Sequence, residues 1–274
     1  MKFLKALFQF YVYSNLHVSI AVACLVLSVG FLFEVEVSHE ALLLMCATFV
    51  SYHLIRFLNR HKYGKKHLLD VFSNQYKVLI YVMIGTAMIV GMYELLQLKM
   101  IQFLHLFPFV VLTLLYAYSF IGKNGVRHSI RFVPGIKIFV IAFVWAGTVV
   151  FFPVTSSVPF DINHIIYFLG LMFFVVVLTL PFDIRDLAFD EKSIRTLPML
   201  LGGKGVKVLG VILLMFSLMI HWSIFGYEGF YQFLITCMVL IFLLFFAKEE
   251  QSKYYASFWV EGIPILYYLL LLYA

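Results

Sequence analysis

Long apolar runs constrain this chain more than any other feature of its sequence. A helix needs roughly 20 mostly apolar residues to cross the hydrocarbon of a bilayer. Runs close to that length lie at 15–33, 40–58, 77–95, 100–120, 134–153, 162–182, 205–225, 229–247 and 257–273. Helices are expected because every backbone polar group must be satisfied inside lipid, and the runs are too long for barrel strands. We therefore predict an all-α, multi-pass membrane protein with about nine transmembrane helices, forming a single domain over residues 1–274.

Composition and charge agree with a membrane protein. The chain is 64% hydrophobic and 12% charged, whereas soluble domains carry about a quarter charged residues. The formal net charge is +6, but the basic residues flank apolar runs. Anionic lipid headgroups or an anionic substrate are therefore the expected partners, and nucleic acid is not. Cys24, Cys46 and Cys237 lie inside apolar runs without paired spacing, so no disulfide framework is predicted.

Basic residues also predict the orientation. With the spans above, the N-terminus shares one side of the membrane with loops 59–76, 121–133, 183–204 and 248–256. Every Lys and Arg except Lys99 lies on that side or at its nearest helix ends. Because cytoplasmic loops are rich in Lys and Arg, the N-terminus is predicted in the cytoplasm and the C-terminus outside. Nothing resembles a eukaryotic targeting signal, so a bacterial plasma membrane is expected.

Carboxylates gather where the sixth apolar run ends, in LTLPFDIRDLAFDEKSIRTLPMLLGGKG. Asp183, Asp186 and Asp190 share one helix face by their i, i+3, i+7 spacing. Acids that converge in this way repel one another unless a cation separates them, and Mg²⁺ bridges carboxylates to phosphates. Lys192 and Arg195, with Arg185, suit phosphate oxygens. The alternative is a solvated helix end on which these acids pair with the neighbouring bases.

The spacing D-x-x-D-x-x-x-D followed by R-T-L-P-x-L-L-G resembles the second signature of the UbiA superfamily of intramembrane prenyltransferases. The residues in register are Asp183, Asp186, Asp190, Arg195, Thr196, Leu197, Pro198 and Gly202. The resemblance implies transfer of a prenyl group from an isoprenoid diphosphate to a lipophilic, aromatic or other acceptor. It implies that the three aspartates are catalytic and hold Mg²⁺ against the diphosphate, with Lys192 and Arg195 nearby.

A Tyr and a Lys after the fourth apolar run are further candidates. The same resemblance implies that Tyr118 and Lys123 contact the diphosphate. The alternative is that Tyr118 belongs to the interfacial aromatic belt and that Lys123 follows the positive-inside rule. Further basic residues, up to Lys137, follow on the same predicted side.

The first UbiA signature, expected at the end of the second apolar run, has lost its aspartates. His53, Arg56 and Arg60 keep the spacing. Aligning His53 with Asp183 also places Tyr52, Arg56, Arg60 and Lys77 on Phe182, Asp186, Asp190 and Lys207, which suggests a repeat of two four-helix halves plus a ninth helix. Arg56 and Arg60 are predicted either to bind the diphosphate or to form salt bridges to Asp186 and Asp190. In the second case the protein is not an enzyme and instead binds a lipid or a partner protein. The sequence leaves both open.

Two isolated polar residues complete the candidates. Glu261 lies within the last apolar run, and an acid at such a position is either functional or a capping or snorkelling residue. His53 is expected to be a hydrogen-bonded interfacial histidine. Acids are absent deep in the other spans, which disfavours an ion or proton transporter. The D-x-x-D-G-x-x-A-R pattern of lipid phosphotransferases is also absent.

Overall fold

The computed structural model describes residues 2–59, 72, 75–118, 120–121, 127–128, 130, 133, 135–154, 160–188 and 195–273. Nearly all of these residues are helical. In chain order the α-helices are α1 (Lys2–Tyr13), α2 (Leu16–Leu32), α3 (Ser38–Asn59), α5 (Lys77–Leu96), α6 (Met100–Ala117), α7 (Lys137–Val154), α8 (Ile162–Arg185), α9 (Leu197–Phe225), α10 (Phe230–Phe246) and α11 (Ile263–Leu272). A 3-10 helix, η3 (Asp186–Ala188), follows α8, and a π-helix, η5 (Tyr255–Val260), precedes α11.

The helices confirm the predicted all-α membrane architecture, and every predicted apolar run overlaps a helix. Within the described residues, seven helices are long and apolar enough to cross a bilayer, or eight if α1 and α2 form one span bent by 59°. This number is lower than the predicted nine because α2 and α10 each have 17 residues. The last run counts as one of the seven spans, Tyr255–Leu272, although it consists of η5 and α11.

The core of the bundle is centred on α8, which packs against α7, α9 and α10. The face that α8 presents to these helices includes fully buried Phe174, Val175, Val177 and Leu180. The first half of the chain joins this core through α2, which contacts α3, α7 and α11. In contrast, α5 packs on α3 and leaves most of its apolar side chains exposed, as expected for a helix that faces lipid.

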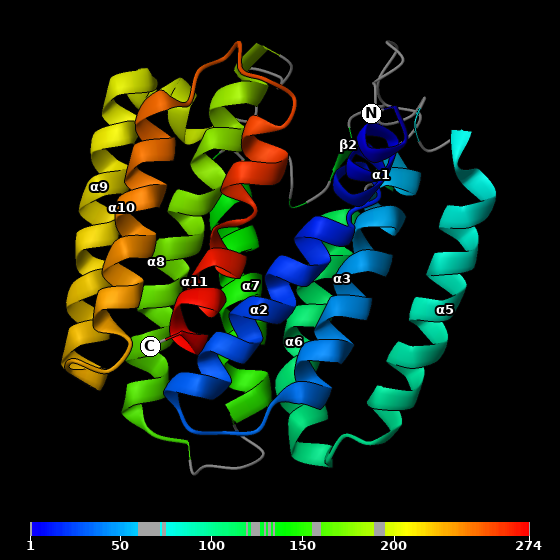
Figure 1. Ribbon diagram of the computed structural model, residues 1–274, viewed down its shortest axis with the longest axis horizontal. Helices are drawn as coiled ribbons and strands as arrows, with labels where there is room; N and C mark the ends of the chain where they lie inside the picture. The colour runs from blue at the N-terminus through cyan, green and yellow to red at the C-terminus, as the bar shows by residue number, and fades with distance from the viewer. Residues whose placement is uncertain are drawn as a thin grey trace.

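Those connections of the two predicted sets that the structure describes lie at opposite ends of the bundle (Figure 1). One end carries α1 and the connection from α10 to η5, and we call it the α1 end. The opposite end carries the turns α2–α3, α5–α6 and α9–α10. A two-stranded antiparallel sheet, β1 (Phe120–Ile121) with β2 (Arg127–His128), follows α6. The polar cluster described next is at the α1 end.

Candidate functional site

Asp183 and Asp186 lie where α8 ends. The α-helix stops at Arg185 and continues as the 3-10 helix η3, so the predicted i, i+3 pair spans the helix terminus. Carboxylates at a helix C-terminus are opposed by the negative end of the helix dipole. Each of the two acids is accordingly paired with a cationic side chain. Asp190, the third predicted acid, lies outside the described residues.

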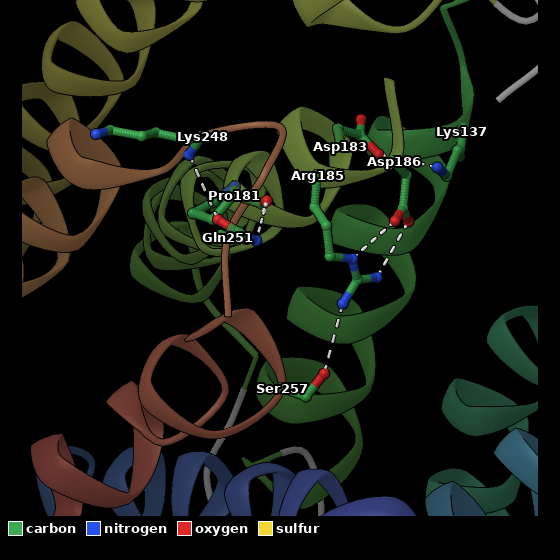
Figure 2. A network of polar contacts seen from close by, with 8 residues as sticks. All are labelled: Lys137, Pro181, Asp183, Arg185, Asp186, Lys248, Gln251 and Ser257. Atoms are coloured by element: carbon green, nitrogen blue, oxygen red, sulfur yellow. Dashed lines mark hydrogen bonds and ion pairs between the residues drawn. The ribbon is translucent and has the colours of Figure 1, made fainter. Parts of the chain in front are cut away.

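The pair between Asp183 and Lys137 is buried. Lys137 is the first residue of α7, and its Nζ lies 2.9 Å from Asp183 Oδ1 (Figure 2). The two side chains are only 13% and 6% exposed, for Lys137 and Asp183 respectively. A buried charge is tolerated only when it is paired and hydrogen-bonded. Lys137 therefore fixes the start of α7 against the end of α8.

Asp186 is paired with its neighbour Arg185. Arg185 Nε and Nη2 donate to the two carboxylate oxygens of Asp186 at 2.8 and 3.2 Å, and Nη1 donates to Ser257 Oγ at 3.5 Å (Figure 2). This bidentate fork is the geometry in which a guanidinium binds a carboxylate or a phosphate. Because Ser257 belongs to η5, Arg185 connects the end of α8 to the last span.

The degenerate first signature holds the bend between α1 and α2. Arg56 donates to Tyr13 O at 3.3 Å and to Asn15 Oδ1 at 2.9 Å. His53 Nε2 donates to Ser14 O at 3.0 Å, which confirms the expected buried, hydrogen-bonded histidine. Asn15 has a left-handed φ of 66° at the break. Among the described residues Asp186 pairs with Arg185, and the alternative salt bridges from Arg56 and Arg60 to Asp186 and Asp190 stay predictions.

Glu261 is the C-cap of the π-helix η5. It follows η5 directly, and Arg185 and Arg56 are both within electrostatic reach of its carboxylate. The hydroxyl of Tyr52, one turn before Arg56 on α3, is also in reach of Glu261. The only signal in the sequence was the position of Glu261 inside an apolar run.

The other predicted binding residues are dispersed or outside the described part. Tyr118 is the C-cap of α6 and is 62% exposed, and within the described residues no hydrogen bond or ion pair joins it to the acids. Arg195 is exposed before α9, with a φ of 47°. Arg60, Lys123 and Lys192 lie outside the described residues, so their predicted contacts with a diphosphate stay predictions.

The local structure at the start of α9 explains several residues of the R-T-L-P-x-L-L-G segment. Thr196 is the N-cap of α9, and Pro198 lies in the first turn, where its missing N–H is not needed. Gly202 interrupts the helix with φ 69° and ψ 167°, a conformation that is essentially restricted to glycine. The segment therefore forms a short helical turn before the main body of α9.

The described donors do not fit a magnesium site held between two acidic motifs. Asp183 and Asp186 are each bound by a cation, and the first motif contributes His53 and Arg56 instead of carboxylates. Over the part of the chain that the structure describes, no cluster of three or more His, Cys, Asp or Glu side chains could hold a metal. The predicted role of Asp183, Asp186 and Asp190 as Mg²⁺ ligands stays a prediction.

Comparisons with known proteins find similarity in structure. No family model matches the sequence, and no curated protein matches it. A UbiA homologue from Aeropyrum pernix K1 superposes with a TM-score of 0.64 and 11% identity, covering 94% of this chain and 97% of that one. A digeranylgeranylglyceryl phosphate synthase superposes with a TM-score of 0.53 and 17% identity, covering 99% and 97%. Because both matches extend over nearly the whole length, the chain has the fold of the UbiA superfamily.

Proposed function

We propose that this protein binds an isoprenoid diphosphate at the α1 end and transfers its prenyl group to a membrane-soluble, aromatic acceptor. The observation that carries the proposal is the fold shared with a UbiA homologue, in which Arg185 and Asp186 are paired at the end of α8 and Arg56 lies on α3. Because fold alone does not establish a reaction, the chemistry of these side chains has to account for the transfer.

The two arginines are suited to the leaving group. A guanidinium is permanently charged and binds phosphate oxygens through a planar fork. When the bond between the allylic carbon and the bridging oxygen breaks, its electron pair leaves with the diphosphate. Arg56 and Arg185 would stabilise the negative charge that develops there. The apolar helices around the site would shield the allylic cation from water. No step here is assigned to a metal.

Ligand-induced thermal stabilisation tests the binding step. A ligand that binds only the folded state stabilises it by about 2.7 kcal/mol at a concentration of 100 Kd. We expect a geranylgeranyl thiodiphosphate to raise the melting temperature of the purified protein, and Arg56→Leu or Arg185→Leu to weaken that effect. Lys248→Leu, at an exposed cation between α10 and η5, is the control. Stabilisation that requires Mg²⁺ and is lost in Asp183→Asn would instead support the acidic site.

A second candidate is a non-catalytic protein that binds an isoprenoid diphosphate or a related lipid. The observation that favours it is that both described acids of the second signature are neutralised by Lys137 and Arg185. Turnover distinguishes the two candidates. Prenylated product from any lipophilic phenol, measured by mass spectrometry, supports the enzyme. Stabilisation by the thio-analogue with no product from geranylgeranyl diphosphate and a panel of phenols supports the binding protein.

A further inference from the structure

The two halves of α1 differ in what covers them. In the second half, Phe8 and Tyr13 both pack on Tyr254 of the α10–η5 connection, with ring centroids 5.2 and 5.7 Å apart. The first two turns instead expose three apolar side chains at 78%, 67% and 57%, namely Phe3, Leu4 and Leu7. The second half of α1 is therefore docked on the bundle, and the first half projects from it.

The exposed side chains of the first half are sorted by polarity. Leu7 follows Phe3 by four residues and Leu4 by three, so the three apolar side chains form one stripe along the helix. Lys5, which is also exposed, shares a different side with Gln9 by its i, i+4 spacing. A helix with an apolar stripe and a basic side is suited to lie in the interface of a bilayer.

The bend between α1 and α2 places this stripe at the level of the lipid headgroups. With 17 residues, α2 is about 26 Å long, slightly less than the roughly 30 Å of hydrocarbon that a span crosses. The bend at Asn15 therefore lies near the boundary of the hydrocarbon. Because α1 leaves α2 at 59°, the roughly 18 Å from Asn15 to Phe3 moves outward by only about 9 Å.

Aromatic and basic side chains at the bend mark the same level. Lys253 Nζ lies 5.3 and 6.0 Å from the ring centroids of Tyr254 and Tyr13. Tyrosine is enriched at membrane–water interfaces, where its ring lies among the headgroups. Lysines near helix ends extend to the same level. The boundary inferred from the length of α2 is thus supported by the side chains around it.

The direction of α1 is set by the protein. From α3, Arg56 donates to Tyr13 O at 3.3 Å and His53 donates to Ser14 O at 3.0 Å. These bonds join the last turn of α1 to the end of a span. The stripe is therefore presented in one orientation, and the helix is not free to turn it toward the bundle.

We propose that the first two turns of α1 insert Phe3, Leu4 and Leu7 into the lipid leaflet at the α1 end, with Lys5 at the lipid phosphates. The partner is a lipid surface because the spans require a bilayer at this level and its phosphates complement the lysine. A second copy of the chain fits less well, since three side chains provide far less than the roughly 800 Å² per partner of a stable interface. The proposal does not depend on the proposed transfer reaction.

The test attaches an environment-sensitive fluorophore to cysteine variants of the full chain in phosphatidylcholine and phosphatidylglycerol nanodiscs, in a Cys24→Ala background. Leu7→Cys and Lys5→Cys are the reporters. Met215→Cys, exposed on α9, and Ser252→Cys, exposed between α10 and η5, calibrate the acyl chains and water. We expect a lipid nitroxide near the headgroup to quench the Leu7→Cys label more than one near the chain end, the reverse of Met215→Cys. Iodide should quench the Lys5→Cys label.

The double variant Phe3→Ser/Leu4→Ser tests the stripe itself. Removing this apolar area weakens insertion, so iodide quenching of the Leu7→Cys label should rise several-fold. The melting temperature in detergent should stay unchanged, because neither side chain packs in the bundle. Unchanged quenching in the double variant would overturn the proposal. Equal iodide quenching of the Leu7→Cys and Lys5→Cys labels would place α1 in water and overturn it, and protection of the Leu7→Cys label from both quenchers would assign the stripe to a protein partner instead.

Discussion

At the scale of single residues, the two ion pairs of the site differ in how far water reaches them. The Lys137 and Asp183 side chains are 13% and 6% exposed, whereas those of Arg185 and Asp186 are 31% and 30% exposed. Removing one partner of a buried pair typically costs about 3–5 kcal/mol, because the other charge stays buried without compensation. Exposed pairs contribute about 0–1 kcal/mol. The first pair is therefore structural, and the second can open to bind a ligand.

Lys137→Met should accordingly destabilise the protein strongly. It leaves Asp183 charged and buried, so we expect a marked fall in melting temperature in detergent, measured by differential scanning fluorimetry. Asp186→Asn, which breaks the more exposed pair, should change the melting temperature only slightly. The double variant Lys137→Met/Asp183→Leu should recover part of the loss, since no buried charge of the pair remains. Equal effects of Lys137→Met and Asp186→Asn would contradict the assignment.

Residue spacing in the sequence identified Asp183 and Asp186 but not their partners. The i, i+3 pattern is local, so it can be read directly from the chain. Lys137 lies 46 residues before Asp183, and Arg185 contacts Ser257, which lies 72 residues later. Such contacts depend on which helices pack together, and apolar runs that all look alike carry no information on their neighbours. The polar residue inside an apolar run was the one available signal.

At the scale of elements, the start of α9 shows why hydropathy alone misplaces a helix end. The apolar run predicted a helix from residue 205, but α9 begins at Leu197. The glycines and Lys204 lower the hydropathy of the first turns, although Thr196 and Pro198 are typical of a helix start. The signals for capping and for lipid contact thus mark different residues. Gly202 separates the two parts with its positive φ.

Gly202→Ala should destabilise α9, while Gly203→Ala should not. A Cβ at either position would meet no atom within 4 Å, so steric contacts do not distinguish them. They differ in backbone, because Gly202 has a φ of 69° and Gly203 carries no such conformation. Alanine in this essentially glycine-only conformation costs about 1–3 kcal/mol, whereas Gly→Ala inside a helix gains about 0.5–1 kcal/mol. The melting temperatures should therefore move in opposite directions, and a shift of both in the same direction would contradict the kink.

At the scale of the whole molecule, the connections at the two ends of the helix bundle bear on its orientation in the membrane. Figure 1 places α1 and the α10–η5 connection at one end, and the turns α5–α6 and α9–α10 at the other. The predicted sidedness of the loops follows from this separation, but the bundle itself does not fix which end faces the cytoplasm. That step depends on Lys and Arg, which the sequence pattern predicts on the side of the α1 end, with Lys99 as the exception. The candidate site would then take its substrates from the cytoplasmic leaflet.

Cysteine labelling in intact cells tests this orientation. Ser252 and Glu228 are both exposed and lie at opposite ends, in the α10–η5 connection and in the α9–α10 turn. Cys46 and Cys237 are buried and Cys24 is half-buried within helices, so a membrane-impermeant maleimide should give little background. We expect Glu228→Cys to be labelled from outside. Ser252→Cys should react only after the membrane is permeabilised, because the positive charges hold its end in the cytoplasm. Labelling of Ser252→Cys in intact cells would contradict the predicted orientation and place the candidate site on the outer face. A diphosphate from the cytoplasm would not reach the site there.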